Sequence, residues 1–316
     1  MARSGRPKSE AGGEVNPAYA PGVYGPNRPF TERDRALIAA TRPASIVLRA
    51  SYEHGRFTPH GADEAAFCRS LGIQMIVVYN AERDDYHEPE LDLLVATFGR
   101  GAVIQIGNEP DQGQPPASDE AAVAAYEQRM WTLRHYLTNV VLVWARRNPD
   151  VRLLPPPLAM GNIGNAVRDE AWQHHEAWLD AWHGEGAGRW RFADLYRDPA
   201  WAGVAVHAYD WAEVVWIAEI VRRWHNKIGG AVWLTEFGLS AMFPGDVIGN
   251  QPMKIAEYCK LQDELATMPY VAASAMFIAG DNLPNTNEAG VKVWPDEYKV
   301  GPAVINLMPE DRKEQS

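Results

Sequence analysis

Short apolar runs alternate with longer amphipathic segments along most of this chain of 316 residues. Such runs predict buried parallel strands, and the segments between them predict the helices that connect parallel neighbours. Strands are predicted at residues 19–24, 45–50, 73–79, 102–106, 151–154, 203–209, 231–238 and 272–279. Eight strands with intervening helices predict an α/β fold, a (β/α)8 TIM barrel, with an open doubly wound sheet as the alternative.

The barrel is predicted to form a single domain over residues 18–308. Helices are predicted at residues 32–40, 62–71, 88–98, 118–147, 169–183, 212–226, 252–268 and 301–307. Residues 1–17 are rich in Gly, Ser, Pro and charge, which predicts a flexible N-terminal arm. Residues 309–316 are expected to form a C-terminal tail. The fifth strand is the least clearly bounded, because three consecutive prolines follow it.

Two of the predicted strands end in a glutamate. Residues 102–111 read Ala-Val-Ile-Gln-Ile-Gly-Asn-Glu-Pro-Asp, so Glu109 follows a buried strand and Pro110 stops the ladder. Residues 231–238 read Ala-Val-Trp-Leu-Thr-Glu-Phe-Gly and carry Glu236 in the same way. Retaining glycoside hydrolysis requires one acid that protonates the leaving oxygen and one carboxylate that attacks the anomeric carbon. We therefore identify Glu109 and Glu236 as candidate catalytic residues.

Other polar and aromatic side chains come at the same ends of the predicted strands. In a parallel barrel these ends share one face, where catalytic residues concentrate. The candidate substrate-binding residues on this rim are Tyr24, Arg49, Tyr79, Asn80, Asn108, His207, Tyr209, Trp211 and Phe277. Three of these residues also have a purely structural alternative. His207 could be a buried histidine with its hydrogen bonds satisfied, Arg49 could form a structural ion pair, and Trp211 could pack in the core.

The charge balance disfavours nucleic acid as a partner. The chain has 41 acidic and 30 basic residues, and its net charge of -11 would repel phosphate along a polyanion. Its 12 Trp and 12 Tyr mildly favour a carbohydrate, because flat aromatic faces stack on sugar rings. An oligo- or polysaccharide is therefore the predicted partner.

No targeting segment or membrane anchor is predicted. Residues 1–14 lack the apolar core of a signal peptide, and no apolar run approaches the roughly 20 residues of a membrane span. We expect a soluble protein that does not bind membranes, either cytoplasmic or released without a signal peptide. The sequence assigns neither the location nor the oligomeric state.

Metal and cofactor chemistry find no support in the motifs. His174-His175-Glu176 lacks the His-Glu-x-x-His spacing, and adjacent residues on a helix face different ways. No Gly-x-Gly-x-x-Gly or Gly-x-x-x-x-Gly-Lys phosphate loop follows a strand, and no Gly-x-Ser-x-Gly elbow occurs. We therefore expect neither a metal nor a cofactor.

Two motifs carry a family resemblance. Gly-Asn-Glu-Pro at residues 107–110 and Trp-Leu-Thr-Glu-Phe-Gly at residues 233–238 resemble clan A of the glycoside hydrolases, as does Val-His-Ala-Tyr on the sixth strand. Within the clan the chain is most similar to family 128, the endo-β-1,3-glucanases, with families 5 and 39 as alternatives. The resemblance implies a retaining (β/α)8 enzyme whose acid/base follows an Asn on strand four and whose nucleophile lies on strand seven.

By position, the resemblance implies that Glu109 is the general acid/base and Glu236 the nucleophile. It also implies that Asn108 hydrogen-bonds the sugar 2-hydroxyl, that Tyr209 donates its hydroxyl to Glu236, and that Arg49 orients Glu236. The chemistry requires the two carboxyl groups about 5 to 5.5 Å apart. It also requires a protonated Glu109, so we expect an apolar wall and the charge of Glu236 to raise the pKa of Glu109.

The chain departs from the clan at the end of the eighth strand, where many members place a tryptophan beneath the reactive sugar. The nearest equivalent is Phe277, which leaves the sugar preference open. The sequence thus predicts a retaining endo-β-glycoside hydrolase that cleaves a polysaccharide such as a β-glucan. A non-catalytic carbohydrate-binding barrel and a transglycosylase with the same residues are the alternatives.

Overall fold

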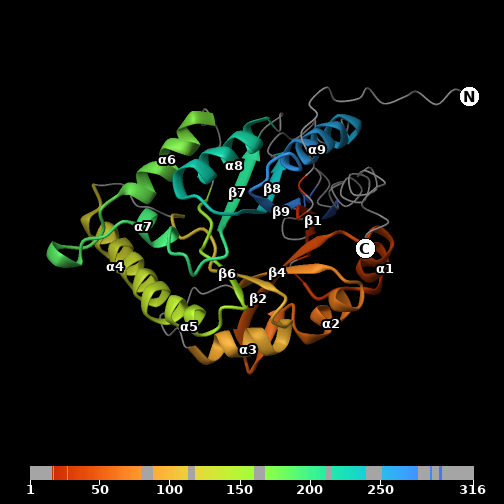
Figure 1. Ribbon diagram of the computed structural model, residues 1–316, viewed down its shortest axis with the longest axis horizontal. Coiled ribbons are helices and arrows are strands. Elements are labelled where there is room, and N and C mark those ends of the chain that lie inside the picture. The colour runs from red at the N-terminus through yellow and green to blue at the C-terminus, as the bar shows by residue number, and fades with distance from the viewer. Residues whose placement is uncertain are drawn as a thin grey trace, which may run out of the picture.

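A computed structural model describes residues 16, 18–26, 28–79, 88–112, 118–159, 168–210, 215–239, 251–276, 285–286 and 292–293. Within these residues eight parallel strands form a nearly closed barrel surrounded by helices (Figure 1). The predicted (β/α)8 fold is confirmed. The predicted helix at 301–307, the predicted tail and almost all of the predicted arm lie outside the described residues.

The barrel strands follow one another around the ring in the order of the sequence. They are β1 (Ala20–Tyr24), β2 (Ser45–Glu53), β4 (Gln74–Tyr79), β5 (Val103–Ile106), β6 (Arg152–Leu154), β7 (Val204–Asp210), β8 (Val232–Leu239) and β9 (Val271–Met276). All neighbours in the described residues pair as parallel ladders except β6 and β7. There the N–H of Ala202 donates to the carbonyl of Leu153 at 2.8 Å, which nearly completes the ring.

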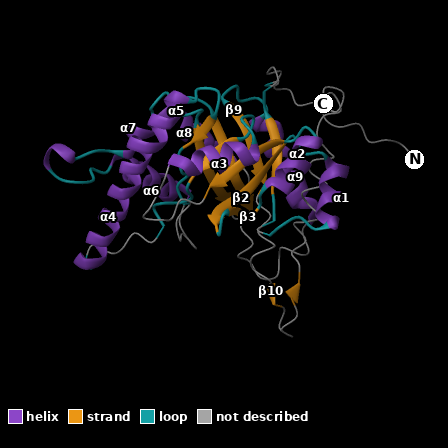
Figure 2. Ribbon diagram, turned by 90° about the horizontal axis from the view of Figure 1, so that it is seen from below, coloured by secondary structure: helices purple, strands orange, loops and turns teal. Residues whose placement is uncertain are grey.

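Helices cover the outside of the barrel (Figure 2). They are α1 (Glu32–Thr41), α2 (Ala62–Ser70), α3 (Glu88–Phe98), α4 (Glu120–Tyr136), α5 (Leu142–Arg147), α6 (Arg168–Asp180), α7 (Phe192–Tyr196), α8 (Val215–Ile228) and α9 (Gln251–Leu265). Asp119 caps α4, because its side chain accepts from the N–H of Ala122 at 3.0 Å. The single helix predicted over 118–147 is interrupted by a π-helical turn, Leu137–Val141.

Alternate strand residues form two apolar layers. One layer fills the barrel and includes Tyr24, Val47, Ile76, Val103 and Trp233. The other lies between the strands and the helices, as the inclusion of both strand and helix residues indicates. The C-terminal ends of the parallel strands share one mouth, which is where the candidate residues were expected.

Two hairpins were not predicted. β2 extends to Glu53 and turns back into β3 (Arg56–Pro59), which pairs with it in antiparallel fashion. β10 (Asn285–Thr286) and β11 (Lys292–Val293) form the second hairpin. Among the helices that the structure describes, none combines the length and the apolarity that crossing a bilayer requires.

Candidate active site

Glu109 lies in a strained turn immediately after β5. Gly107 has a φ of 79°, and its N–H donates to the carbonyl of Tyr79 at 2.7 Å. Glu109 has a φ of 45°, in the left-handed region that residues other than glycine seldom adopt. Its N–H donates to the carbonyl of Pro157 at 3.0 Å, so the chain that follows β6 holds the turn. Backbone strain is thus located at the residue whose carboxylate enters the site.

A β-bulge in β8 turns Glu236 toward the barrel mouth. Before the bulge, Leu234 pairs with Val206, and both side chains lie in the layer beneath the helices. Strict alternation would place Glu236, two residues later, on that same side. Instead the register shifts so that His207 pairs with Glu236, and Thr235 is the additional residue. The bulge therefore brings the imidazole and the carboxylate onto the inner face together.

His207 lies between the two glutamates. Its Nδ1 is 2.8 Å from Oε1 of Glu109, and its Nε2 is 3.7 Å from Oε2 of Glu236. One carboxylate oxygen of each glutamate and one nitrogen of His207 all lie within 4.8 Å of one another. The side chains of Glu109, Glu236 and His207 are 15%, 8% and 1% exposed. Two carboxylates that are distant in the sequence thus meet in one largely enclosed site.

Tyr209 and Arg49 flank these groups. Tyr209, two residues after His207 on β7, donates its hydroxyl to Oε1 of Glu236. Arg49 donates its Nε–H to the hydroxyl of Tyr24 at 2.5 Å, and its Cζ lies 5.6 Å from the centroid of that ring. Within the described residues Arg49 forms no ion pair with Glu236, which corrects the expected direct bond. Its charge still lowers the pKa of both glutamates.

The pKa direction of Glu109 is opposite to the expectation, and that of Glu236 differs from it. Burial raises the pKa of Glu109, but the hydrogen bond and charge of His207, with Arg49 and Gln112, outweigh it and leave this pKa below its ordinary value. Burial raises the pKa of Glu236, and although His207 opposes this, the charge of Glu109 adds to the rise. Burial lowers the pKa of His207, but the two carboxylates outweigh burial and raise it. The prediction of a raised pKa for Glu109 was wrong, because it took no account of a bond from His207.

Two further residues of the same turn support Glu109 and were not singled out from the sequence. Nε2 of Gln112 donates to Oε2 of Glu109. Asp111 is buried, and its Oδ1 accepts from the N–H of Ala159 at 2.7 Å while its Oδ2 lies 2.9 Å from Nε2 of His174. In the sequence, the only indication of these two residues is that polar residues continue after Pro110.

Of the remaining predicted residues, one lies beside Glu109, one faces away from the site, and three lie outside the described residues. Asn108 lies beside Glu109, and its Oδ1 accepts from Nε2 of Gln105 at 3.5 Å. Tyr79 is a correction: it is 3% exposed and packs against Phe57 beneath the helices, with ring centroids 6.4 Å apart. Strand alternation explains this, because Val78 occupies the inner face and Tyr79 must face outward. The last three candidates, Asn80, Trp211 and Phe277, lie outside the described residues.

The same three side chains could geometrically hold a metal ion. Glu109, His207 and Glu236 each bring one ligand atom within 4.8 Å of the others. However, Oε1 of Glu109 is bonded to His207 and Oε1 of Glu236 accepts from Tyr209. Two carboxylates engaged with proton donors fit acid–base chemistry better than a coordination sphere.

The family follows from the segment that contains these residues. A family model described as the glycosyl hydrolase catalytic core matches residues 102–290, more than half of the chain. The chain belongs to the glycosyl hydrolase catalytic core family. The matched segment includes Glu109, His207, Tyr209 and Glu236. No curated protein matches the chain.

Solved structures share the fold of this chain at low sequence identity. An endo-β-1,3-glucanase of glycoside hydrolase family 128 (subgroup II) from Sorangium cellulosum has a TM-score of 0.54 and 13% identity, covering 92% of this chain and 99% of that one. An oligosaccharide-binding protein of the same family (subgroup VII) from Cryptococcus neoformans has a TM-score of 0.53 and 13% identity, covering 94% and 98%. A variant of a subgroup I endo-β-1,3-glucanase from Amycolatopsis mediterranei, in complex with laminaritriose and laminaribiose, has a TM-score of 0.50 and 14% identity, covering 90% and 99%. The resemblance to family 128 found in the sequence is confirmed at the level of the fold.

Proposed function

We propose that this glycosyl hydrolase is a retaining endo-β-glycosidase that acts on a β-glucan, with Glu109 as general acid/base and Glu236 as nucleophile. The observation that carries the proposal is the approach of one oxygen of each carboxylate to within 4.8 Å. Retaining enzymes separate the two carboxyl groups by about 5 to 5.5 Å, whereas inverting enzymes leave about 6.5 to 9.5 Å for a water molecule. Single oxygens that approach to within 4.8 Å leave little room for a water between the carboxylates, which supports direct attack by one of them.

In the first half-reaction Glu236 attacks the anomeric carbon while Glu109 protonates the departing glycosidic oxygen. The bond to the leaving oxygen breaks, and an ester between the sugar and Glu236 forms. The Tyr209 hydroxyl engages Oε1 of Glu236, whereas Oε2 is buried and has no hydrogen-bond partner in the described part of the chain. The Tyr209 hydroxyl thus orients the carboxylate of Glu236.

His207 delivers the proton that the first step requires. The raised pKa of His207 and the lowered pKa of Glu109 favour an imidazolium beside two carboxylates in the free site. Transfer of the Nδ1 proton to Oε1 of Glu109, across 2.8 Å, produces the protonated acid, an ionised Glu236 and a neutral His207. A bound glycosidic oxygen accepts a hydrogen bond from protonated Glu109 and so favours this arrangement.

The second half-reaction reverses the roles. The leaving sugar takes the proton from Glu109, which is then ionised and accepts a proton from an incoming water. The water oxygen attacks the anomeric carbon, the ester bond to Glu236 breaks, and the β configuration is restored. One group thus acts as the acid and then as the base.

The substrate class rests on the proteins that share the fold. Two of the solved structures above are named endo-β-1,3-glucanases, and one of them holds laminaritriose and laminaribiose. A β-1,3-glucan is therefore the first substrate to test, with internal cleavage as the expected mode.

Separate replacement of the two glutamates tests the assignment. Glu109→Gln and Glu236→Gln should each reduce turnover of a β-1,3-glucan by several orders of magnitude, whereas Glu53→Gln on the exposed β2–β3 turn should not. Azide added to Glu236→Gly should restore turnover of an activated aryl glycoside and give the α-glycosyl azide, because the small anion occupies the vacated position. Near-normal activity in either Gln variant would end the proposal, and so would failure of azide to rescue any variant of either glutamate.

A non-catalytic oligosaccharide-binding barrel is the second candidate. It is favoured by one specific observation, the fold shared with the oligosaccharide-binding protein from Cryptococcus neoformans. Calorimetry and product analysis on the same glucan, mannan and xylan samples separate the two functions. Binding without products on every polysaccharide would favour this candidate over the hydrolase.

A further inference from the structure

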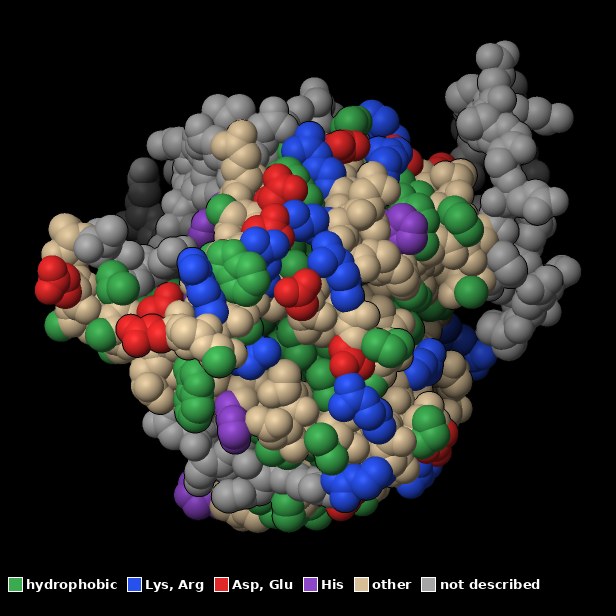
Figure 3. Space-filling view, turned by 60° about the vertical axis from the view of Figure 1, so that its left-hand side comes forward, with side chains coloured by type: hydrophobic (Ala, Val, Ile, Leu, Met, Phe, Trp, Pro, Cys, Tyr) green, Lys and Arg blue, Asp and Glu red, His purple; other side chains and the backbone are tan. Residues whose placement is uncertain are grey.

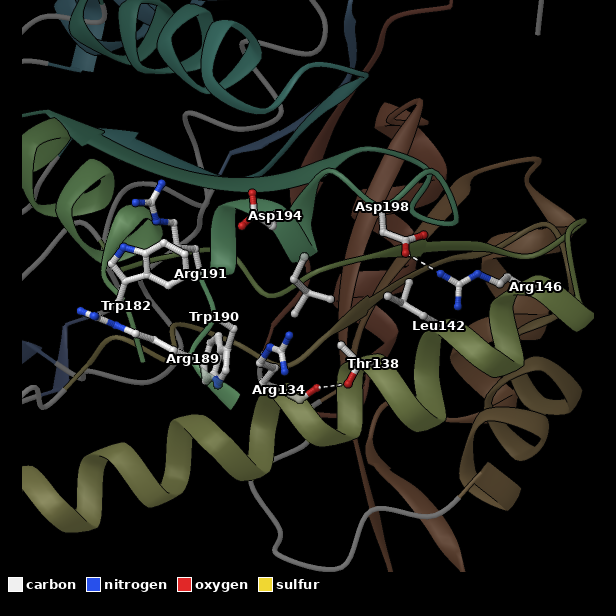
Figure 4. A pocket seen from close by; sticks show the side chains of 11 residues that line it. Arg134, Thr138, Leu142, Arg146, Trp182, Arg189, Trp190, Arg191, Asp194 and Asp198 are labelled. Atoms are coloured by element: carbon white, nitrogen blue, oxygen red, sulfur yellow. Dashed lines mark hydrogen bonds and ion pairs between the residues drawn. The ribbon is translucent and has the colours of Figure 1, made fainter. Parts of the chain in front are cut away.

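An arginine-lined cavity lies on the outer wall of the barrel. A cavity of about 410 Å³ lies between the α4–α5 helices and the segment from residue 182 to residue 198 (Figure 4). Its lining includes four arginines, Arg134, Arg146, Arg189 and Arg191. None of its lining residues contacts either catalytic glutamate in the described part of the chain. Lys and Arg side chains extend across the middle of this side of the molecule, with acidic side chains between them (Figure 3).

The carboxylates of the cavity are already paired. Asp198 forms an ion pair with Arg146 at 2.5 Å. Asp194 lies 3.5 Å from Arg197, which is not a lining residue. The other three arginines of the cavity are Arg134, Arg189 and Arg191. No carboxylate among the described residues forms an ion pair with them. No described carboxylate therefore balances their positive charge, in a chain whose net charge is -11.

These three arginines contact aromatic rings instead of carboxylates. The Cζ atoms of Arg191 and Arg189 lie 4.2 and 5.3 Å from the ring centroid of Trp182. The Cζ atom of Arg134 lies 4.7 Å from the ring centroid of Trp190. Figure 4 shows the first two side chains beside Trp182 and the third beside Trp190. A cation–π contact orients a guanidinium without neutralising its charge.

The backbone of this segment presents two of the arginines together. His183 and Trp190 pair across a short hairpin, each donating its N–H to the carbonyl of the other at 2.9 and 3.0 Å. Arg189 and Arg191 are both extended, so their side chains leave the same side and that of Trp190 leaves the other. Gly184 permits the tight turn, because its φ is 77° and a Cβ there would lie 2.8 Å from the carbonyl oxygen of Gly188.

Several donors of the lining residues have no acceptor in the described part of the chain. The Nε atoms of Arg134 and Arg191 and the indole nitrogen of Trp190 are buried without a hydrogen-bond partner among the described residues. Burial lowers the pKa of Arg134, as expected for a guanidinium that has no carboxylate to oppose the effect. A group of donors and positive charges without acceptors is complementary to an oxyanion.

We propose that this cavity binds a small ligand through a phosphate or sulfate group. Arginine forks donate several N–H groups to such oxyanions, and guanidinium groups are well suited to sites of low exposure. The volume exceeds that of the oxyanion alone and falls in the range of small-ligand pockets, so it also accommodates a body of the size of a sugar ring. The net charge disfavours a long polyanion as the occupant.

Titration calorimetry at low ionic strength tests the proposal with glucose 6-phosphate, glucose 6-sulfate and glucose. At least one of the charged sugars should bind more tightly than glucose, and the one that binds identifies the group. Arg134→Gln should weaken that binding by about tenfold or more, because one charge-assisted contact is lost. Arg56→Gln, which removes an exposed arginine of the β2–β3 hairpin, should leave it unchanged.

Two results would overturn the proposal. One is the absence of any preference for the charged sugars over glucose. The other is equal weakening of their binding by Arg134→Gln and Arg56→Gln. If Arg134→Gln fails to fold, as judged by circular dichroism, Arg189→Gln removes an exposed arginine of the same cavity and takes its place.

Discussion

Nδ1 of His207 lies 2.8 Å from Oε1 of Glu109, and this contact governs where the site holds its proton. The imidazole is 1% exposed, so water cannot take over its role. Its hydrogen bond and charge are the largest of the effects that lower the pKa of Glu109 against burial. A residue outside the carboxylate pair therefore controls where the proton of the site is held.

The first prediction concerns the pH dependence of His207→Gln. His207 holds the proton that Glu109 needs, so activity is lost at high pH as His207 loses that proton and at low pH as Glu236 gains one. Without His207 only the carboxyl groups can hold this proton, so the basic limb of the profile of kcat/KM against pH should move to lower pH. Because His207 lowers the pKa of Glu236, the acidic limb should move to higher pH. Limbs that stay where they are in the parent protein would contradict the role given to His207.

The second prediction concerns the strained turn. Because Glu109 has a φ of 45°, Glu109→Gly should be more stable than Glu109→Ala by about 1 kcal/mol, the cost of the left-handed conformation for a residue with a Cβ. Both variants lose the carboxylate, so the comparison isolates the backbone. Denaturant unfolding of the two proteins measures the difference. An alanine variant that is equally stable would show that the turn relaxes.

The third prediction concerns the orientation of the nucleophile. Tyr209→Phe removes the hydroxyl that engages Oε1 of Glu236 and should lower kcat by about 100-fold, the usual cost of losing one positioned donor. It should also raise the acidic limb of the pH profile, since this hydrogen bond lowers the pKa of Glu236. Tyr52→Phe, on the hairpin, is the matched control and should change neither quantity. An unchanged kcat in Tyr209→Phe would remove this role.

The fourth prediction concerns the support of the acid/base. Asp111→Ala removes the acceptor of the Ala159 N–H and the partner of His174, so it frees the loop that carries Glu109. The unpaired buried N–H should cost about 1 to 3 kcal/mol of unfolding free energy. Misplacement of Glu109 should lower kcat by about 100-fold, with a smaller change in KM. A loss of stability with kcat intact would show that Asp111 supports only the fold.

The fold was predictable because its signals are local. Each apolar run that predicts a strand is bounded by a turn, and each amphipathic segment repeats at helical spacing, so the eight strands and their order followed from the sequence. The π-helical turn at Leu137–Val141 was not predictable, because its residues continue the helical pattern without a proline or glycine. The β2–β3 hairpin was missed because β2 continues through polar residues after Ala50.

The pair of glutamates was predictable from the strand ends, but their arrangement was not. Strict alternation along β8 would direct Glu236 toward the helices, and only the bulge at Thr235 turns it inward. In this strand no glycine or proline precedes Glu236, so the sequence does not indicate a bulge there. The same dependence on tertiary structure explains why Tyr79 was misplaced and why the bond from His207 to Glu109 was not expected.

Trapping of the glycosyl-enzyme tests the central claim most directly. A 2-deoxy-2-fluoro laminaribiosyl fluoride should form the ester quickly, because fluoride leaves readily, and release it slowly, because fluorine at C2 destabilises the second transition state. Mass spectrometry of the digested protein should then find one 2-deoxy-2-fluoro-laminaribiosyl group attached to the peptide that contains Glu236, and none in Glu236→Gln. Attachment to Glu109 or to another residue, or cleavage of a β-glucan that yields the inverted anomer, would contradict the account.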